Sequence, residues 1–140
     1  MADASIEICR LCVMAGICFS VENLAGSYLF DYMRQAGLGD LCDVYMINFC
    51  QCAYGLRFPD TDKFSFCRKN TFLMTNMQSL RQLERKCPGI SPSHKHVHAQ
   101  GTCKVEGRTV RRSALAGHYP LALCQAWCRA AAESGSPCLQ

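Results

Sequence analysis

The sequence predicts an α/β fold in which helices flank part of a β-sheet. Three observations favour this class. Segments rich in β-prone apolar residues alternate with segments of helical periodicity, the first two predicted strands are joined by a helical crossover, and 49% of the 140 residues are hydrophobic. Only three strands are predicted, fewer than a complete doubly wound sheet contains, so we expect an incomplete sheet.

The N-terminal third is expected to form a helix, a strand and a second helix. Residues 4–16 carry apolar residues at helical spacing and end at Gly16. Residues 17–21, ICFSV, form a short apolar run that stops at a polar pair, which indicates a buried strand. Residues 27–37 begin with Ser27, a residue type that caps helices, and are predicted to be a short helix.

The rest of the chain supplies two further strands and two further helices. Residues 43–52 and 70–76 are the second and third predicted strands, separated by a turn-rich loop over residues 54–66. Residues 77–87 have helical periodicity. The clearest helix covers residues 118–134, with a proline near its start.

Length and composition predict one domain over residues 1–140, within which residues 88–117 form a loop-rich segment with histidines and basic residues. The net charge of +4 permits a nucleic-acid partner without requiring one. No signal peptide or membrane-spanning run is recognised, so we expect an intracellular protein, nuclear or cytoplasmic, with no membrane partner. Most of the twelve cysteines are then expected to be reduced and buried.

The strongest local pattern for chemistry is a cysteine followed by closely spaced histidines. Cys87, His94 and His96 supply thiolate and imidazole, the ligands that zinc prefers, and side chains two apart on an extended strand point the same way. Zinc is therefore a possible cofactor, with Cys52 as the predicted fourth ligand and His98 or Cys103 as alternatives. The competing interpretation is a solvated histidine-rich loop without metal.

Five short motifs occur in an order that resembles a known family. They read "FSVENLAGSYLF", "CAYGLRFPDTDKFSF", "NTFLMTN", "KCPGISPSHKHVH" and "GHYPLALCQAWCRAA". Together they resemble the C-terminal half of a divergent DNA cytosine-5 methyltransferase-like domain, of the kind found in phages and eukaryotic mobile elements. The resemblance covers roughly residues 6–133. It implies a partial Rossmann-like sheet of the methyltransferase type that lacks its N-terminal cofactor-binding half.

The resemblance implies catalytic roles for Glu22 and Asn23. In the family, the glutamate at this position hydrogen-bonds the flipped cytosine, and the asparagine braces the loop. A glutamate suits this role because burial raises its pKa toward neutrality, and the base must leave the duplex to reach such a pocket. The alternative is that Glu22 and Asn23 cap the helix that follows.

The chain departs from the family pattern, because the glycine-rich cofactor turn and the Pro-Cys nucleophile motif are not recognised. S-adenosylmethionine is expected to bind only if a missing N-terminal half is supplied. We therefore expect a remnant or partial methyltransferase-like protein of mobile-element origin that is not catalytically competent alone. The alternative is a small non-enzymatic zinc- and nucleic-acid-binding module, and a third possibility is a degenerate reading frame.

DNA is the expected partner under either of the first two readings. The resemblance and the charge clusters indicate seven cations for phosphate contacts, although a solvated linker would account for the last three equally well. An incomplete sheet also leaves an edge strand, residues 17–21, for self-association. The seven predicted nucleic-acid-binding residues are Arg57, Lys63, Arg68, Lys69, Arg108, Arg111 and Arg112.

Overall fold

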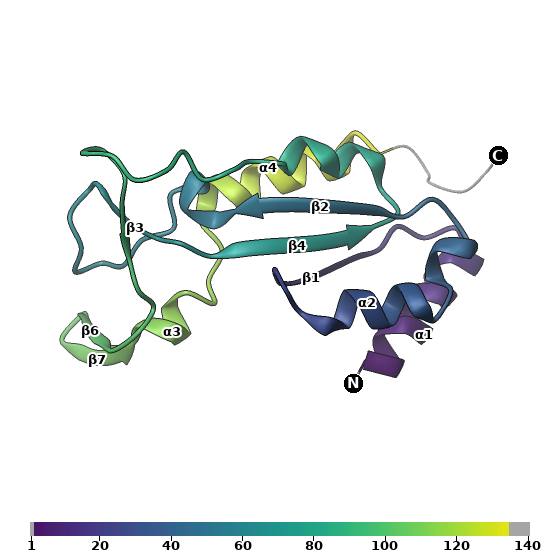
Figure 1. Ribbon diagram of the computed structural model, residues 1–140, viewed down its shortest axis with the longest axis horizontal. Helices are drawn as coiled ribbons and strands as arrows, with labels where there is room; N and C mark the ends of the chain where they lie inside the picture. The colour runs from purple at the N-terminus through teal and green to yellow at the C-terminus, as the bar shows by residue number, and fades with distance from the viewer. Residues whose placement is uncertain (1, 135–140) are drawn as a thin grey trace.

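The protein is described by a computed structural model that covers residues 2–134. Helices, strands and 3₁₀ turns alternate along it in a mixed α/β arrangement (Figure 1). Its elements are α1 (Ala2–Met14), β1 (Ser20–Leu24), α2 (Tyr28–Gln35), η1 (Leu38–Asp40), β2 (Tyr45–Cys50), η2 (Gln51–Tyr54), β3 (Ser65–Cys67), β4 (Asn70–Thr75), η3 (Gln78–Leu83), β5 (Lys95–Val97), β6 (Thr102–Val105), β7 (Arg108–Arg111), α3 (Arg112–Leu115) and α4 (Leu121–Ala132).

The main sheet has three strands in the order β1-β4-β2, and both outer strands pair antiparallel with β4. The crossover predicted between the first two strands is present as α2. However, β4 is inserted between β1 and β2, which run parallel to each other without touching. The parallel pairing of a Rossmann-like sheet is therefore not found in the three-stranded sheet of the described chain. The reason is that residues 51–69 leave the sheet and return in the opposite direction.

Each face of the sheet is covered by helices (Figure 1). On one face, α4 and η3 pack over β2 and β4, and the fully buried side chains there include Phe49, Leu73 and Leu123. On the other face, α1 and α2 pack around Met33 and Met74. The alternation of side chains along β4 produces this division, because successive residues point to opposite faces.

A second, smaller body lies beyond one end of the sheet and contains β3, β5, β6, β7 and α3 (Figure 1). We call residues 55–68 and 87–117 the metal lobe. Its β3 and β5 pair in parallel, and β6 and β7 form an antiparallel hairpin. Its own core contains four buried residues: Leu56, Phe58, Cys67 and Ala116.

The first strand begins later than the sequence predicts. Residues 17–19 continue from the end of α1, where the side chain of Asn76 holds them. Its Oδ1 accepts a hydrogen bond from Phe19 N–H at 2.8 Å, and its Nδ2 donates to the Ile17 carbonyl at 3.1 Å. The ladder therefore starts at Ser20, and β1 is partly exposed, so the prediction of a buried strand over 17–21 is wrong.

Two further segments differ from the prediction. Residues 77–87 were expected to be one helix, but a 3₁₀ turn ends at Leu83, because Arg85 must extend beside β2 and bridge to Phe49. The loop-rich segment 88–117 contains three short strands, which depend on partners distant in sequence or on a tight Glu106-Gly107 turn with positive φ at both residues. Within residues 2–134, no helix has the length and apolarity needed to cross a bilayer.

Candidate metal centre

Four side chains converge where the metal lobe joins the sheet. Cys52, Cys87, His94 and His96 each contribute one ligand atom to a group whose members all lie within 4.8 Å of one another. These are the four residues that the sequence predicts as metal ligands, and the structure brings them together. The group could hold a metal ion, because thiolate sulfur and imidazole nitrogen are common ligands of transition metals.

Backbone hydrogen bonds at the end of β2 position the two cysteines. Cys52 lies in η2, which continues directly from β2. The carbonyl of Arg85 accepts a hydrogen bond from Cys50 N–H at 2.8 Å, which holds the segment after η3 beside the end of β2. Cys87 follows two residues later and therefore reaches Cys52. The N–H of Gly89 donates to Cys87 Sγ at 3.3 Å.

A tight turn and a strand pairing position the two histidines. Ser91 and His94 exchange backbone hydrogen bonds of 3.0 and 3.1 Å, which reverse the chain just before β5. The parallel pairing of β5 with β3 then sets His96 opposite Phe66. The rings of Phe66 and His94 are stacked, with centroids 4.6 Å apart and planes inclined by 14°. The orientation of both imidazoles is thus set by β3.

The ligand atoms are close to one another. Cys87 Sγ lies 3.3 Å from His96 Nε2 and 3.7 Å from His94 Nε2, and the two Nε2 atoms are 3.2 Å apart. Cys52 and His94 are buried, with 2% and 7% of their surface exposed, whereas Cys87 and His96 are half-buried. One side of the group is therefore shielded from water, and the other is open to an incoming ion.

The surroundings of the candidate ligands shift the pKa of two of them, Cys52 and His96, and both shifts favour the uncharged form. Burial raises the pKa of the Cys52 thiol, and the neighbouring thiols of Cys50, with its Sγ 3.1 Å away, and Cys87 raise it further. Burial also lowers the pKa of His96, and the positive charges of His94 and Arg68 add to this effect. The favoured forms are therefore a neutral imidazole at His96 and a thiol at Cys52, and a bound cation would favour the thiolate.

The structure distinguishes Cys52 from the two alternative fourth ligands. His98 is exposed and lies outside the four-residue group. Cys103 is buried in β6 and is not a member of the group either. Sequence spacing did not separate these three candidates, because Cys52 reaches the group only through the contact between Arg85 and β2.

Comparisons of the chain with protein-family models, with curated proteins and with solved structures give no match. The resemblance to cytosine-5 methyltransferases therefore stays a prediction carried by its motif residues. We infer function from the residues and their geometry.

The two predicted catalytic residues lie within β1 rather than after its end. Both Glu22 and Asn23 belong to the ladder with β4. The side chain of Asn23 accepts a hydrogen bond from Leu24 N–H at 2.8 Å. Neither residue caps the next helix, because the N-cap of α2 is Ser27, whose hydroxyl accepts a hydrogen bond from Leu29 N–H at 3.2 Å.

Glu22 has two neighbours that the sequence analysis did not connect with it. Lys69 Nζ lies 3.9 Å from Glu22 Oε1, and both side chains are about four-fifths buried, with 18% and 20% of their surface exposed. Although 41% of the Tyr119 surface is exposed, partial desolvation, and then the carboxylate of Glu22 as a hydrogen-bond partner and negative charge, raise the pKa of Tyr119 to about 12. Lys69 Nζ also lies 5.5 Å from the centroid of the Tyr119 ring. Glu22 and Tyr119 come from the first and last motifs, and Lys69 lies between the second and third.

Of the seven basic residues predicted to contact nucleic acid, two make ion pairs within the protein. Lys69 pairs with Glu22, and Arg112 Nη2 lies 2.6 Å from Asp60 Oδ2. The other five are exposed: Arg57, Lys63, Arg68, Arg108 and Arg111.

Charge is distributed unequally between the two parts of the molecule. The metal lobe contains eight lysines and arginines against three acidic residues, whereas residues 1–50 contain two against six. The overall charge of +4 hides this asymmetry. The unequal charge distribution can be counted from the sequence, but only when it is known which segments form the lobe.

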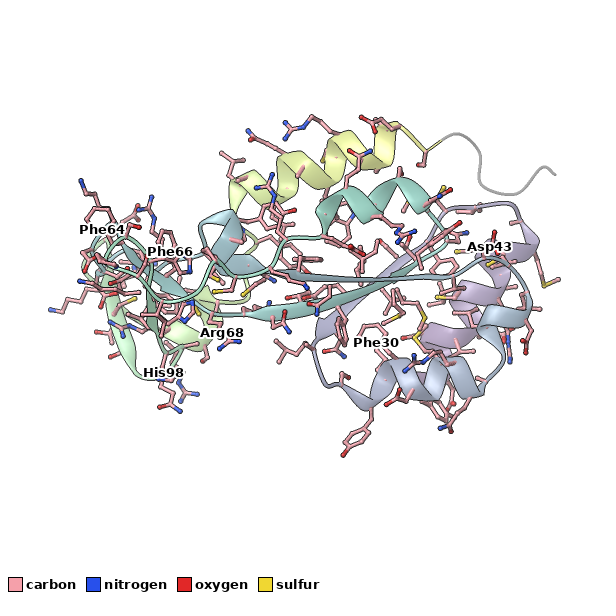
Figure 2. The ribbon with its side chains drawn as sticks, turned by 45° about the horizontal axis from the view of Figure 1, so that its top comes forward. Phe30, Asp43, Phe64, Phe66, Arg68 and His98 are labelled. Atoms are coloured by element: carbon pink, nitrogen blue, oxygen red, sulfur yellow. The ribbon has the colours of Figure 1, made fainter. Side chains whose placement is uncertain are left out.

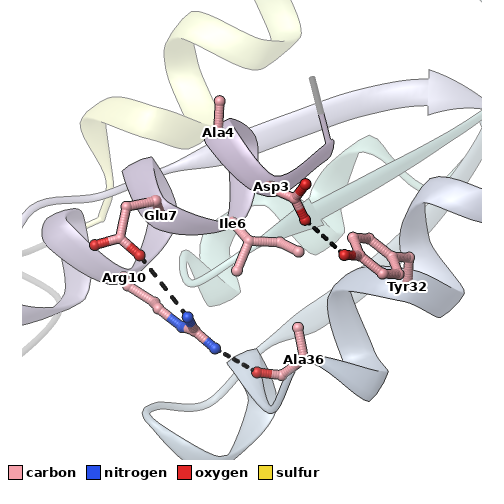
Figure 3. Close-up of a pocket in the computed structure, with 7 residues that line it drawn as sticks. All are labelled: Asp3, Ala4, Ile6, Glu7, Arg10, Tyr32 and Ala36. Carbon is pink, nitrogen blue, oxygen red and sulfur yellow. Dashed lines mark hydrogen bonds and ion pairs between the residues drawn. The ribbon is translucent and has the colours of Figure 1, made fainter.

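A hollow between α1 and α2 is a weaker candidate for a site (Figure 3). Tyr32 donates a hydrogen bond to Asp3 Oδ1 at 2.5 Å, and Arg10 donates to the Ala36 carbonyl at 2.7 Å. Arg10 also lies 3.8 Å from Glu7. Because the charged and hydroxyl groups around the hollow are already paired with one another or with the backbone, they tie α1 to α2.

Proposed function

We propose that this chain is a small non-enzymatic module in which zinc holds a basic, nucleic-acid-binding lobe in place. The observation that carries the proposal is the meeting of Cys52, Cys87, His94 and His96 within 4.8 Å at the base of that lobe. Two thiols and two imidazoles form a ligand set that is typical of structural zinc.

The distances among three of the four ligand atoms are close to those around a tetrahedral zinc ion. With Zn–S bonds of about 2.3 Å and Zn–N bonds of about 2.0–2.1 Å, neighbouring ligand atoms of a regular tetrahedron lie about 3.3 to 3.8 Å apart. The separations of 3.3 and 3.7 Å from Cys87 Sγ to the two histidines lie within this range, and the 3.2 Å between the two Nε2 atoms lies just below it. All four atoms lie within 4.8 Å of one another, so zinc would draw the group closer together. With Cys52, all four positions are filled by protein, as in structural rather than catalytic zinc sites.

A structural metal would serve a clear purpose in this lobe. Its core contains only four buried residues, and its longest strands have four residues. Segments this small rarely fold on hydrophobic burial alone and often depend on a metal. Cys52 would supply a ligand from η2, Cys87 one from the segment after η3, and His94 and His96 two from the beginning of β5. A zinc ion bound by these residues would therefore join three separate segments of the chain.

The charge of the lobe supports a polyanionic partner. Eight cations against three acids create a positive potential that attracts phosphates, and such binding weakens as salt displaces it. Arg108 and Arg111 lie on the β6–β7 hairpin, and Arg57 and Lys63 lie in the loop before β3. We expect these exposed residues to make the phosphate contacts.

Metal analysis combined with a binding assay tests both halves of the proposal. Protein purified without chelator should carry about one zinc per chain, and a labelled oligonucleotide should bind it with an affinity that falls as salt rises. Chelation should weaken binding, because it loosens the lobe. A folded sample without zinc would contradict the metal half. A zinc-loaded sample that binds no nucleic acid would contradict the other half.

The second candidate function is a partial DNA cytosine-5 methyltransferase-like protein of mobile-element origin, inactive alone. One observation favours it: Glu22 and Tyr119, which belong to the first and the last of the family-like motifs, lie near each other and near Lys69. Calorimetric titration of S-adenosylmethionine into the purified chain tests it. We expect no binding, since no glycine-rich cofactor turn is recognised in the sequence. Binding with micromolar affinity would show that the chain binds S-adenosylmethionine without a further N-terminal half.

A further inference from the structure

We infer that the outer face of the β3–β5 pair is a platform for single-stranded nucleic acid, on which Phe64 stacks against a base while Arg68 and neighbouring cations contact phosphates. The inference rests on the proposed function and adds the class of nucleic acid and the residues that bind it. The platform shares its face of the two strands with the metal group, because His96 is paired with Phe66 and His94 stacks on the Phe66 ring, and Phe64 lies next to that group along β3.

The alternation of side chains along residues 64–68 creates the platform. Ser65 and Cys67 are buried, so Phe64, Phe66 and Arg68 point to the opposite side. The ladder includes Phe64, because its carbonyl accepts a hydrogen bond from Lys95 N–H at 2.7 Å. Figure 2 places Phe64, Phe66, Arg68 and His98 at one end of the molecule, far from Phe30 and Asp43.

Phe64 is available for stacking. Its side chain is 40% exposed, although a large apolar ring is usually buried. Lys63 Nζ lies 4.9 Å from the ring centroid, and Arg57 donates to the Lys63 carbonyl at 3.4 Å. An exposed ring with a lysine over it and an arginine nearby offers an aromatic surface for a base and positive charge for the adjoining phosphates.

Phe66 has a different role, because His94 already covers its ring. Phe66 therefore links the platform to the metal group and does not itself bind a base. Loss of the metal should then disturb the position of β3 and weaken binding indirectly.

The acidic residues beside the platform are occupied by the fold. Asp62 accepts hydrogen bonds from Phe64 N–H at 2.7 Å and from the Ser65 hydroxyl at 3.0 Å, and these bonds lower its pKa. Asp60 is paired with Arg112. The hydrogen bonds of Asp62 fix the turn that presents Phe64. The Phe64 ring is therefore held in place before nucleic acid binds, which reduces the conformational entropy lost on binding.

The platform suits a single strand better than a duplex. Bases of a single strand are free to stack on a surface ring, whereas those of a duplex are already stacked. The competing mode is a duplex bound by the β6–β7 hairpin, since a two-stranded ribbon fits the major groove.

Fluorescence anisotropy with labelled oligo(dT), oligo(U) and a duplex tests the inference on the zinc-loaded full chain. Oligonucleotides of about 16 nucleotides exceed a typical site size. Both single strands should bind more tightly than the duplex. Phe64→Ala should weaken single-strand binding by about 5- to 150-fold, and Phe64→Leu should also weaken it, because the π-face is lost. Arg68→Ala should reduce the salt slope by about one.

Tyr28→Ala is the matched control, since Tyr28 is an aromatic residue 87% exposed on α2, in the acidic part of the molecule. It should leave binding unchanged. Equal affinity for duplex, or an unaltered affinity in a folded, zinc-loaded Phe64→Ala protein, would overturn the platform while leaving the proposed function intact. Loss of duplex binding in Arg108→Ala or Arg111→Ala with no effect of Phe64→Ala would assign binding to the hairpin. Absence of binding to every oligonucleotide would overturn the nucleic-acid function itself.

Discussion

His94 and His96 place their Nε2 atoms 3.2 Å apart, with Cys87 Sγ within 3.7 Å of both. Two protonated imidazoles at this distance would repel each other, whereas a cation shared between their lone pairs is favourable. The parallel pairing of β5 with β3 enforces the approach, because it holds both rings near Phe66. The fold therefore holds the two imidazoles at a distance that suits a hydrogen bond between neutral rings or a cation bound between their lone pairs.

The first prediction concerns the identity of the fourth ligand. Cys52→Ser should abolish stoichiometric zinc binding, because serine cannot supply a thiolate. His98→Ala should keep the metal, since His98 is exposed and outside the group. Elemental analysis of both purified variants decides the question. Full zinc content in Cys52→Ser together with loss in His98→Ala would assign the fourth position to His98 instead.

The second prediction concerns the contribution of the metal to stability. A ligand that binds only the folded state at a thousandfold excess over its Kd adds about 4 kcal/mol. A chelator should therefore lower the melting temperature of the wild-type chain, and His96→Ala should remove most of this response. Scanning calorimetry with and without chelator measures it. His118→Ala is the control, since His118 is exposed and lies just before α4; a chelator effect unchanged by His96→Ala would argue against the assigned ligand.

The third prediction concerns the packing of α4 on the sheet. Leu123 is fully buried, whereas Leu121, two residues earlier on the same helix, is 71% exposed. Leu123→Ala should lower the free energy of unfolding by about 2–5 kcal/mol, because it leaves a cavity against β2 and β4. Leu121→Ala should change it by at most about 0.5 kcal/mol. Urea unfolding compares the two, and equal effects would mean that α4 does not pack as described.

The fourth prediction concerns self-association. In the described sheet, β1 is an outer strand, which leaves one of its edges without a strand partner. We expect the chain to associate through this edge at high concentration. Leu24→Lys places a charge at the end of the edge and should reduce association, whereas Leu121→Lys on α4 should not. Light scattering over a range of concentrations measures the effect, and a monomer at every concentration would contradict it.

The fifth prediction concerns alkaline pH. The pKa of Tyr119 is raised from 10.0 to about 12 in the folded protein. Between these values the unfolded chain has lost the phenol proton while the folded chain retains it. The stabilisation is therefore fully present below pH 10 and is lost as pH rises toward 12.

Tyr119→Phe has no phenol proton, so its stability should fall less than that of the wild type across this range. Urea unfolding on either side of the ordinary tyrosine pKa, at about pH 9 and about pH 11, compares them. Tyr28→Phe, at an exposed tyrosine, should behave like the wild type. An equal decline in wild type and Tyr119→Phe would show that Tyr119 does not couple folding to pH.

Local patterns in the sequence were sufficient for several of the elements and for three of the four candidate ligands. The helical spacing of residues 4–16, the serine cap at Ser27 and the apolar run within 43–52 correspond to α1, α2 and β2. The spacing of Cys87, His94 and His96 indicated metal ligands, although the segment that carries them was predicted to be loop-rich and β5 is in fact a strand. These features depend on periodicities of a few residues, which the sequence carries directly.

The pairing direction of the strands and the proximity of Cys52 to Cys87 were decided by the tertiary structure alone. An antiparallel β4 between β1 and β2 cannot be read from the strand sequences, because pairing direction depends on how the chain returns after residues 51–69. Cys52 lies 35 positions before Cys87, and only the hydrogen bond between Cys50 and Arg85 brings the two segments side by side. Long-range contacts of this kind follow from the packing of the whole core, and no short window of the sequence contains them.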